Sequence, residues 1–176
     1  LSRVLGLNGH INISTTQSRL IDFDKLSARV RMMDGVNMVT PLIEAHAMAS
    51  ANDVASGVVV RGMRAADFAV KPILSRNLRV GSIEKFAKNE GVFLGSRLAR
   101  RMGIFLGDQI TLISPSGNPS AFGTMPRMKA YSVIGIVEIG MFEYDDNFIY
   151  MPLTLAQKLF RLENSVTSLE GVIDEA

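Results

Sequence analysis

The side chains that most often carry out chemistry are scarce in this sequence and widely separated. The 176 residues contain no Cys and only two His, His10 and His46, so disulfides, thiolate metal sites and Cys nucleophiles are excluded. Neither His has a second His at ligand spacing, and we expect both to be ordinary surface or core residues. Serines such as Ser14 and Ser96 lie in no nucleophile-elbow pattern, and no Gly-rich phosphate loop precedes a Lys-Ser or Lys-Thr pair. The sequence therefore predicts a protein that is not an enzyme and that uses no cofactor and no metal.

An acidic cluster formed by Glu143, Asp145 and Asp146 lacks the pattern of a calcium loop. Such a loop alternates oxygen ligands over about a dozen residues and has a Gly at its bend. We therefore expect a solvated connection between two strands at this point.

Charge is distributed unevenly along the chain, although the net charge is only +2. Residues 1–60 carry five basic and five acidic side chains, residues 61–130 twelve and four, and residues 131–176 two and eight. Blocks of opposite sign can neutralise one another within a fold or face different partners, and the sequence leaves both open. A nucleic-acid site needs exposed aromatics among its basic side chains, whereas the basic segment 97–101 is interleaved with apolar residues typical of a core. We expect no nucleic-acid binding, and a basic nucleic-acid-binding module is the weakest alternative.

The elements that position these residues mix strands and helices without regular alternation, which is typical of an α+β fold. Apolar residues make up 47% of the chain, enough for a globular core, and no apolar run is long enough to span a bilayer. The patterns predict strands over residues 9–16, 36–39 continuing over 45–49, 57–62, 91–95, 109–114, 129–139, 148–151 and 168–174. They predict helices over residues 22–34, 65–70, 73–78, 82–88, 96–102 and from 152 onward.

The helix over residues 22–34 should bury one face, because residues three and four positions apart lie above one another on a helix. Asp22 is placed to cap its N-terminus, and Gly35 is placed to stop it. The residues expected on the buried face are Phe23, Leu26, Val30 and Met33.

The segment from Pro115 to Met128 joins two strongly predicted strands and is too long for a tight hairpin loop, which needs two to five residues. It carries Phe122, Met125 and Pro126 among Gly and Ser. A loop that covers nothing should be polar, so this apolar content favours either docking on a partner or packing back on the protein's own body. The residues alone leave these two alternatives open.

Four segments carry a resemblance to a known family. Residues 92–112, with their Gly-Ser, Leu-Ala, Met-Gly and Gly-Asp pairs between two strands, resemble the core of the MacB-type periplasmic domain found in permease subunits of bacterial ABC transporters. Three further segments are similar to the lipoprotein-releasing permease of the LolC/LolE type: residues 5–10, the Pro- and Met-bearing segment before 131–136, and residues 140–145 with 150–153.

This resemblance implies a MacB-like periplasmic domain in two parts. A discontinuous Porter-like β-α-β subdomain would comprise residues 1–63 and 152–176, truncated at its C-terminus because the family normally continues with another helix and strand. An inserted Sabre-like subdomain would comprise residues 64–151 and would carry a long β-hairpin, the hook, over residues 114–130.

The function implied by the resemblance is the release of outer-membrane lipoproteins from the bacterial inner membrane. The chain would be a soluble fragment from the periplasmic face of that membrane in a Gram-negative bacterium, with ATP hydrolysed by a separate cytoplasmic subunit that acts through the transmembrane region. Its other partners would be lipoprotein substrates, a second permease subunit and a periplasmic lipoprotein carrier. The hook residues expected to bind the carrier are Pro115, Phe122, Met125, Pro126, Arg127, Met128 and Lys129. The alternative is the mechanotransmission domain of another MacB-like exporter or cell-division permease, which would bind no carrier.

Overall fold

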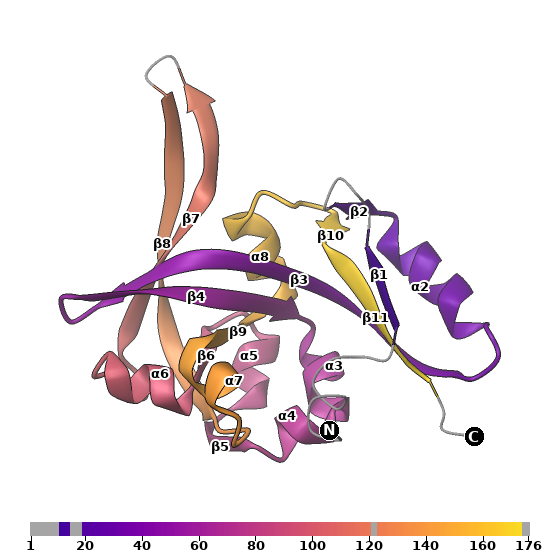
Figure 1. Ribbon diagram of the computed structural model, residues 1–176, viewed down its shortest axis with the longest axis horizontal. Helices are drawn as coiled ribbons and strands as arrows, with labels where there is room; N and C mark the ends of the chain where they lie inside the picture. The colour runs from indigo at the N-terminus through magenta and orange to yellow at the C-terminus, as the bar shows by residue number, and fades with distance from the viewer. Residues whose placement is uncertain (1–10, 15–18, 121–122, 174–176) are drawn as a thin grey trace.

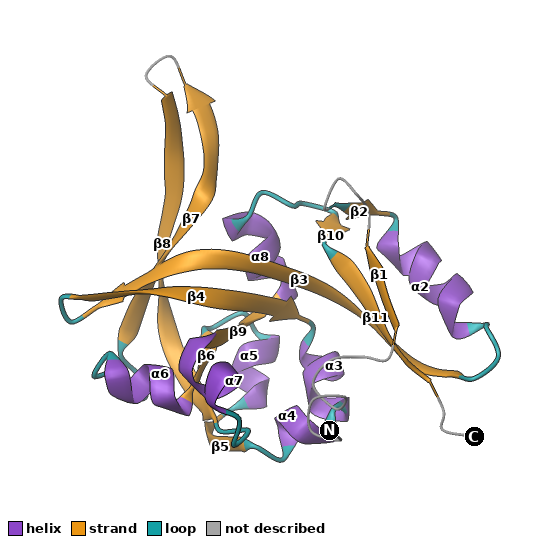
Figure 2. Cartoon of the chain, viewed as in Figure 1, coloured by secondary structure: helices purple, strands orange, loops and turns teal. Residues whose placement is uncertain are grey.

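The computed structural model describes residues 11–14, 19–120 and 123–173 as a mixed α/β domain (Figure 1). A nine-stranded sheet forms its centre, two short strands pair separately, and helices pack against the sheet (Figure 2). In chain order the elements are β1 (Ile11–Ser14), β2 (Leu20–Ile21), α2 (Phe23–Arg31), β3 (Val36–Ala51), β4 (Val54–Met63), α3 (Ala65–Val70), α4 (Pro72–Ser75), β5 (Leu78–Gly81), α5 (Ile83–Ala87), β6 (Val92–Gly95), α6 (Ser96–Arg101), β7 (Gln109–Ser120), β8 (Gly123–Val137), α7 (Phe142–Asn147), β9 (Phe148–Pro152), α8 (Leu153–Leu159), β10 (Ser165–Val166) and β11 (Ser168–Ile173).

The sheet is organised around the long strand β3. Its first half pairs with β11 up to Leu42, its second half pairs with β4 from Ile43 onward, and residues 48–50 also pair with β7. The strand order is β1-β11-β3-β4-β9-β6-β8-β5, with β7 joining β3 to β8. The pairs β4–β9 and β6–β8 are parallel and the others are antiparallel. The expected mixture of strands and helices is confirmed, while the division into Porter-like and Sabre-like subdomains stays a prediction.

Helices α3 and α5 are held on the sheet by an aromatic cluster. The ring of Phe93 on β6 lies 5.2 Å from that of Phe68 and 4.7 Å from that of Phe86, between ring centroids. Tyr150 on β9 adds an edge-to-face contact with Phe68 at 5.9 Å. Such offset and edge-to-face pairs add about 0.5–1.5 kcal/mol each beyond the burial of their area, so this cluster fixes the short helices that could not form alone.

Helix α8 lies directly against β4 because a glycine stands at the point of closest approach. A Cβ atom added at Gly62 would overlap the Cβ of Ala156. Leu155 and Leu159 of the same helix are buried, and Leu162 beyond its end is partly buried.

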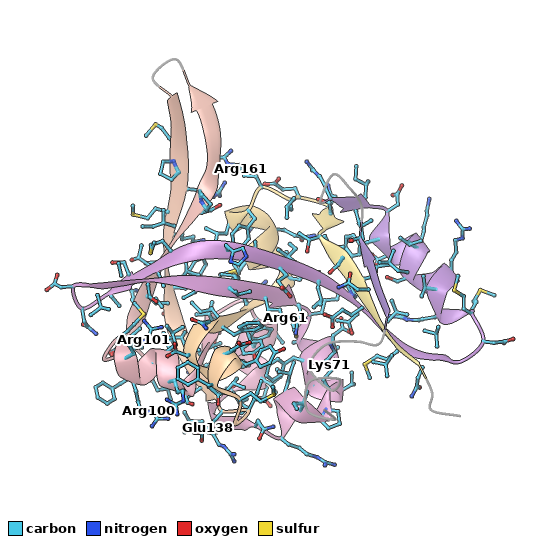
Figure 3. The ribbon with its side chains drawn as sticks, in the orientation of Figure 1. Arg61, Lys71, Arg100, Arg101, Glu138 and Arg161 are labelled. Atoms are coloured by element: carbon cyan, nitrogen blue, oxygen red, sulfur yellow. The ribbon has the colours of Figure 1, made fainter. Side chains whose placement is uncertain are left out.

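A cluster of buried charges connects β11 to the middle of the chain; its two cations, Arg61 and Lys71, are labelled in Figure 3. The Glu170 carboxylate on β11 contacts the Arg61 guanidinium on β4, and its second oxygen lies 3.2 Å from the Lys71 ammonium. These three side chains are at most 5% exposed, whereas Glu44, 3.4 Å from Arg61, is half-exposed. Burial lowers the pKa of Lys71, and the neighbouring Glu170 carboxylate opposes that shift. Glu170 therefore balances two buried cations.

Ion pairs also neutralise the two oppositely charged blocks of the chain. Glu138 lies 3.6 Å from Arg79 and 3.7 Å from Arg100, and Asp146 lies 3.2 Å from Arg101. Each pair joins the basic segment 61–130 to the acidic segment 131–176, as the contacts of Glu170 do. Neutralisation within the fold is thus confirmed for these residues.

Helix α2 is shorter than predicted, and this changes its buried face. Phe23 and Val30 are buried and Leu26 packs partly against the core, but Met33 is 59% exposed. The prediction for Met33 is wrong because the helix ends at Arg31, which places residue 33 in the turn before strand β3. Asp22 stands at the N-terminus of the helix as expected, although its side chain makes no capping hydrogen bond.

The acidic cluster is not the solvated connection that the sequence suggested. Residues 142–147 form helix α7, and Asp145 is buried. Its carboxylate accepts hydrogen bonds from the backbone N–H groups of Ile139 at 2.8 Å and Gly140 at 2.9 Å. The prediction was wrong because this carboxylate supports the turn before the helix. Among the described residues no group of three His, Cys, Asp or Glu could hold a metal ion.

We predict that Glu170→Gln destabilises the domain by about 3–5 kcal/mol, because it removes the buried carboxylate that Arg61 and Lys71 share. The matched control is Glu138→Gln, which also removes a carboxylate between two cations but at the surface, where a pair contributes about 0–1 kcal/mol. Urea unfolding followed by circular dichroism measures both. Equal losses for the two variants would contradict the importance of the buried cluster.

We predict that Val30→Ala lowers the free energy of unfolding by about 2 kcal/mol, since it removes two buried carbon groups and leaves a cavity. Met33→Ala should change it by less than about 0.5 kcal/mol, as expected for an exposed position. Thermal or urea unfolding of both variants checks the orientation of α2. A larger loss for Met33→Ala than for Val30→Ala would mean that the assigned buried face is wrong.

Candidate partner-binding hairpin

The segment over residues 115–128, for which the residues left docking and self-packing open, is part of a long β-hairpin formed by β7 and β8. At its base, residues 111–113 of β7 are hydrogen-bonded to β3 on one side and to β8 on the other. From Ser114 outward, β7 and β8 pair only with each other among the described residues. The two strands therefore leave the body of the domain as a projecting ribbon (Figure 1), which at about 3.3 Å per residue extends roughly 20 Å.

The hairpin is irregular near the point where it leaves the body. Ser114 pairs with Arg127 and Asn118 pairs with Met125. Between these two pairs β7 advances by four residues while β8 advances by two. Pro115, which has no backbone N–H, begins the irregular stretch, and proline is found in sheets mainly at edges and bulges. Bulges and edge prolines also protect an exposed ribbon from pairing with other chains.

The described candidate residues lie on both faces of the ribbon. Because side chains alternate along a strand, Met125, Arg127 and Lys129 share one face of β8, and Pro126 and Met128 share the other. Met125 is 68% exposed and Met128 is 62% exposed. Pro115, Pro126 and Lys129 are exposed as well, and Arg127 is half-buried. Phe122, also expected to contact a partner, lies outside the described residues.

The exposure of these methionines speaks against packing on the protein's own body for the described part of the hairpin. Neither Met125 nor Met128 packs back on the body, since both keep most of their surface accessible. An apolar side chain held on a projecting ribbon is a feature of docking elements. Its role in binding stays a prediction.

Tyr131 anchors the base of the hairpin and was not identified from the sequence as a site residue. It is buried on β8 opposite Ile110, and the Lys129 ammonium lies 5.7 Å from the centre of its ring. Burial raises the pKa of Tyr131 to about 12, with the Arg127 charge partly opposing the shift. The alternation of β8 could have indicated this residue, because it lies two positions beyond Lys129 on the same face.

We predict that the contribution of Tyr131 to stability is present below about pH 10 and is lost as the pH rises toward about 12. The folded state holds the phenol proton more tightly than the unfolded state does, so unfolding becomes easier once the unfolded form releases it. The urea midpoint of the wild type should therefore fall more between about pH 9 and about pH 11 than that of Tyr131→Phe. Parallel curves for the two proteins would mean that Tyr131 is solvated.

With this geometry established, comparison with known proteins identifies the family. The model of the MacB-like periplasmic core domain matches residues 4–174. The chain belongs to the MacB-like periplasmic core domain family. It is thus a periplasmic domain of the kind found in MacB-like ABC transporter permeases, a family of non-catalytic domains, and this confirms the expectation that it is not an enzyme. No helix in the described ranges is long and apolar enough to cross a membrane.

Curated relatives of this MacB-like domain resemble it at low identity. It is 25% identical over 168 residues to the "Lipoprotein-releasing system transmembrane protein LolC" of Neisseria meningitidis serogroup B, an alignment that covers 95% of this chain and 40% of that protein. It is 26% identical over 162 residues to the protein of the same name from Xylella fastidiosa, covering 92% of this chain and 39% of that protein. The domain is therefore LolC-like by distant homology, and it spans about 40% of the length of these relatives.

Solved structures show the same fold at lower identity. The extracellular domain of the transporter YknZ from Gram-positive bacteria superposes with a TM-score of 0.60 at 13% identity, covering 94% of this chain and 85% of that one. The periplasmic region of MacB from Actinobacillus actinomycetemcomitans superposes with a TM-score of 0.54 at 12% identity, covering 94% and 67%.

Proposed function

We propose that this chain is the periplasmic domain of a lipoprotein-releasing permease subunit and that its β7–β8 hairpin binds a periplasmic lipoprotein carrier. The observation that carries the proposal is the exposure of Met125 and Met128 on a ribbon that leaves the body of the domain. The distant LolC likeness supports the setting, because those relatives are named as parts of a lipoprotein-releasing system.

The hairpin can contribute both affinity and speed of association. Methionine side chains are flexible and polarisable, so they adapt to an apolar groove on a partner. Arg127 and Lys129 lie on the same face as Met125 and would attract an acidic rim, which acts mainly on the association rate. Because β3 pairs with β7 at the base of the ribbon, little conformational freedom near the base is lost on binding.

The remaining partners follow from the same proposal. The domain would stand on the periplasmic face of the inner membrane of a Gram-negative bacterium, joined to the membrane-spanning part of its subunit. It would act with a second permease subunit and a cytoplasmic ATPase subunit, and lipoproteins would be the substrates. Movement driven by ATP hydrolysis would bring the hairpin and its bound carrier to the released lipoprotein.

We predict that Met125→Ala and Met128→Ala each weaken binding of the purified carrier about thirty-fold, or ~2 kcal/mol, as expected when an interface anchor is truncated. Isothermal titration measures the affinity, and replacing residues 117–126 with a short Gly-Ser linker should abolish it. The matched control is Met33→Ala, which also removes an exposed methionine but on the turn after α2.

Equal affinities for the wild type, the two hairpin variants and the shortened hairpin would refute the proposal. Binding of no carrier by the wild type would favour the domain of another MacB-like exporter or cell-division permease. Circular dichroism of each variant should match that of the wild type, because the truncated side chains are solvated. If shortening the hairpin unfolded the domain, the proposed independence of the ribbon would be wrong.

A further inference from the structure

The turn between α6 and β7 holds two apolar side chains in solvent. Phe105 is 76% exposed and Leu106 is 53% exposed. Asp108 closes this turn on itself, since its carboxylate accepts a hydrogen bond from the Phe105 N–H at 2.8 Å and its own N–H donates to the Phe105 carbonyl at 3.0 Å. Gly107 has a φ of +93°, a conformation that favours glycine. The Gly-Asp pair thus builds a turn that presents Phe105 and Leu106.

Hydrogen bonds to the neighbouring strand hold this turn in place. The Gly107 N–H donates to the Val133 carbonyl at 2.8 Å, and the Val133 N–H donates to the Asp108 carbonyl at 2.8 Å. Phe105 and Leu106 are therefore exposed on a turn that is already ordered. Binding a partner there costs less conformational entropy than ordering a flexible loop would.

A groove lies beside this turn, and Phe105 and Leu106 form part of its wall. Its main cavity of about 510 Å³ lies between β5, α6 and β8, with Val80, Ile104 and Ile136 in its walls. A second cavity of about 420 Å³ shares Leu106 with the first and extends to Lys85. Strand β5 ends the described sheet and pairs there only with β8, and its residues Arg79 and Val80 line the groove.

The polar groups of the groove favour an anionic ligand group. Arg79 and Arg100 stand on its wall with side chains 55% and 72% exposed, and they share the single Glu138 carboxylate at 3.6 and 3.7 Å. Figure 3 labels Arg100 and Glu138. Lys85 adds a third cation. The Ser96 hydroxyl also lines the groove; it is buried and has no hydrogen-bond partner among the described residues. The three cations Arg79, Arg100 and Lys85 outnumber the one carboxylate, Glu138, so this wall carries a net positive charge.

We propose that this groove binds an extended segment of a protein partner that carries an apolar side chain next to a carboxylate. The apolar side chain would fill the cavity against Phe105 and Leu106, and the carboxylate would pair with Arg79 and Arg100. A concave site beside an edge strand suits an extended peptide, whose backbone can pair with the strand while alternate side chains enter pockets. This inference does not rest on carrier binding, because α6 and β5, which line the groove, lie on the other side of β3 and β4 from the projecting part of β7 and β8 (Figure 1).

Site-specific photo-crosslinking in cells that make the full-length protein tests the proposal. A benzophenone amino acid at position 105 should crosslink to one protein segment, while the same group at Met33, which is similarly exposed but distant, should not. The crosslinked segment, mapped by mass spectrometry, should contain an Asp or Glu within a few residues of the attachment point. Combining Arg79→Glu with Arg100→Glu should lower the yield at least ten-fold, whereas Arg76→Glu, an exposed change outside the groove, should leave it unchanged.

The decisive step is a charge exchange. Replacing the mapped acidic residue of the partner with Arg should restore crosslinking to the Arg79→Glu, Arg100→Glu variant, which a loss of folding could not allow. Crosslinks to lipid alone would overturn the proposal, as would equal yields at positions 105 and 33. The proposal would also be overturned if the mapped segment contained no acidic residue. The same holds if the crosslinking yield at position 105 were unchanged by the charge reversals at Arg79 and Arg100.

Discussion

Strand β3 hydrogen-bonds to three other strands, and the arrangement of the domain follows from how its two edges are covered. A buried strand has to satisfy the N–H and C=O groups of every residue. Here β11 pairs with the first half of β3 and β4 pairs with its second half. Near the end of β3, β7 pairs with residues 48–50 on the edge opposite β4. Because β11 is the last described strand and β7 begins the hairpin, β3 brings residues 168–173 and the candidate binding element into a single sheet.

The buried charges lie where β3 exchanges one partner strand for another. Glu44 and Arg61 are opposite each other in the β3–β4 register, and Glu170 reaches the same guanidinium from β11. Taking charges out of water costs several kcal/mol per ion unless each finds a partner. The two strands are therefore placed relative to each other by electrostatics as well as by backbone hydrogen bonds, and Lys71 extends this constraint to the start of α4.

The β7–β8 hairpin connects the two candidate binding surfaces, which are the groove beside Phe105 and the projecting ribbon with Met125 and Met128. The turn with Phe105 and Leu106 leads into β7, and Val133 and Ile136 of β8 line the groove, while Met125 and Met128 stand toward the other end of the same two strands. Strands paired along most of their length move together more readily than separate loops do. A domain of a transporter permease that meets different partners at the two ends of one ribbon would have a direct physical connection between them.

Much of this protein could be predicted from its residues. Several properties are local: the scarcity of His and Cys, the period of the strands and the apolar content of segment 115–128. The structure agrees with the predicted strands. Strand β5 and helix α7 were missed because each is short and depends on neighbours from elsewhere in the chain. The tertiary structure alone decided that Asp145 is buried, that Met33 is exposed, and that the basic and acidic blocks meet in ion pairs. The physical reason is that sequence periodicity shows only which face of a helix or strand is apolar. Whether that face is buried, and which charges pair across it, depends on which residues from distant parts of the chain pack against it.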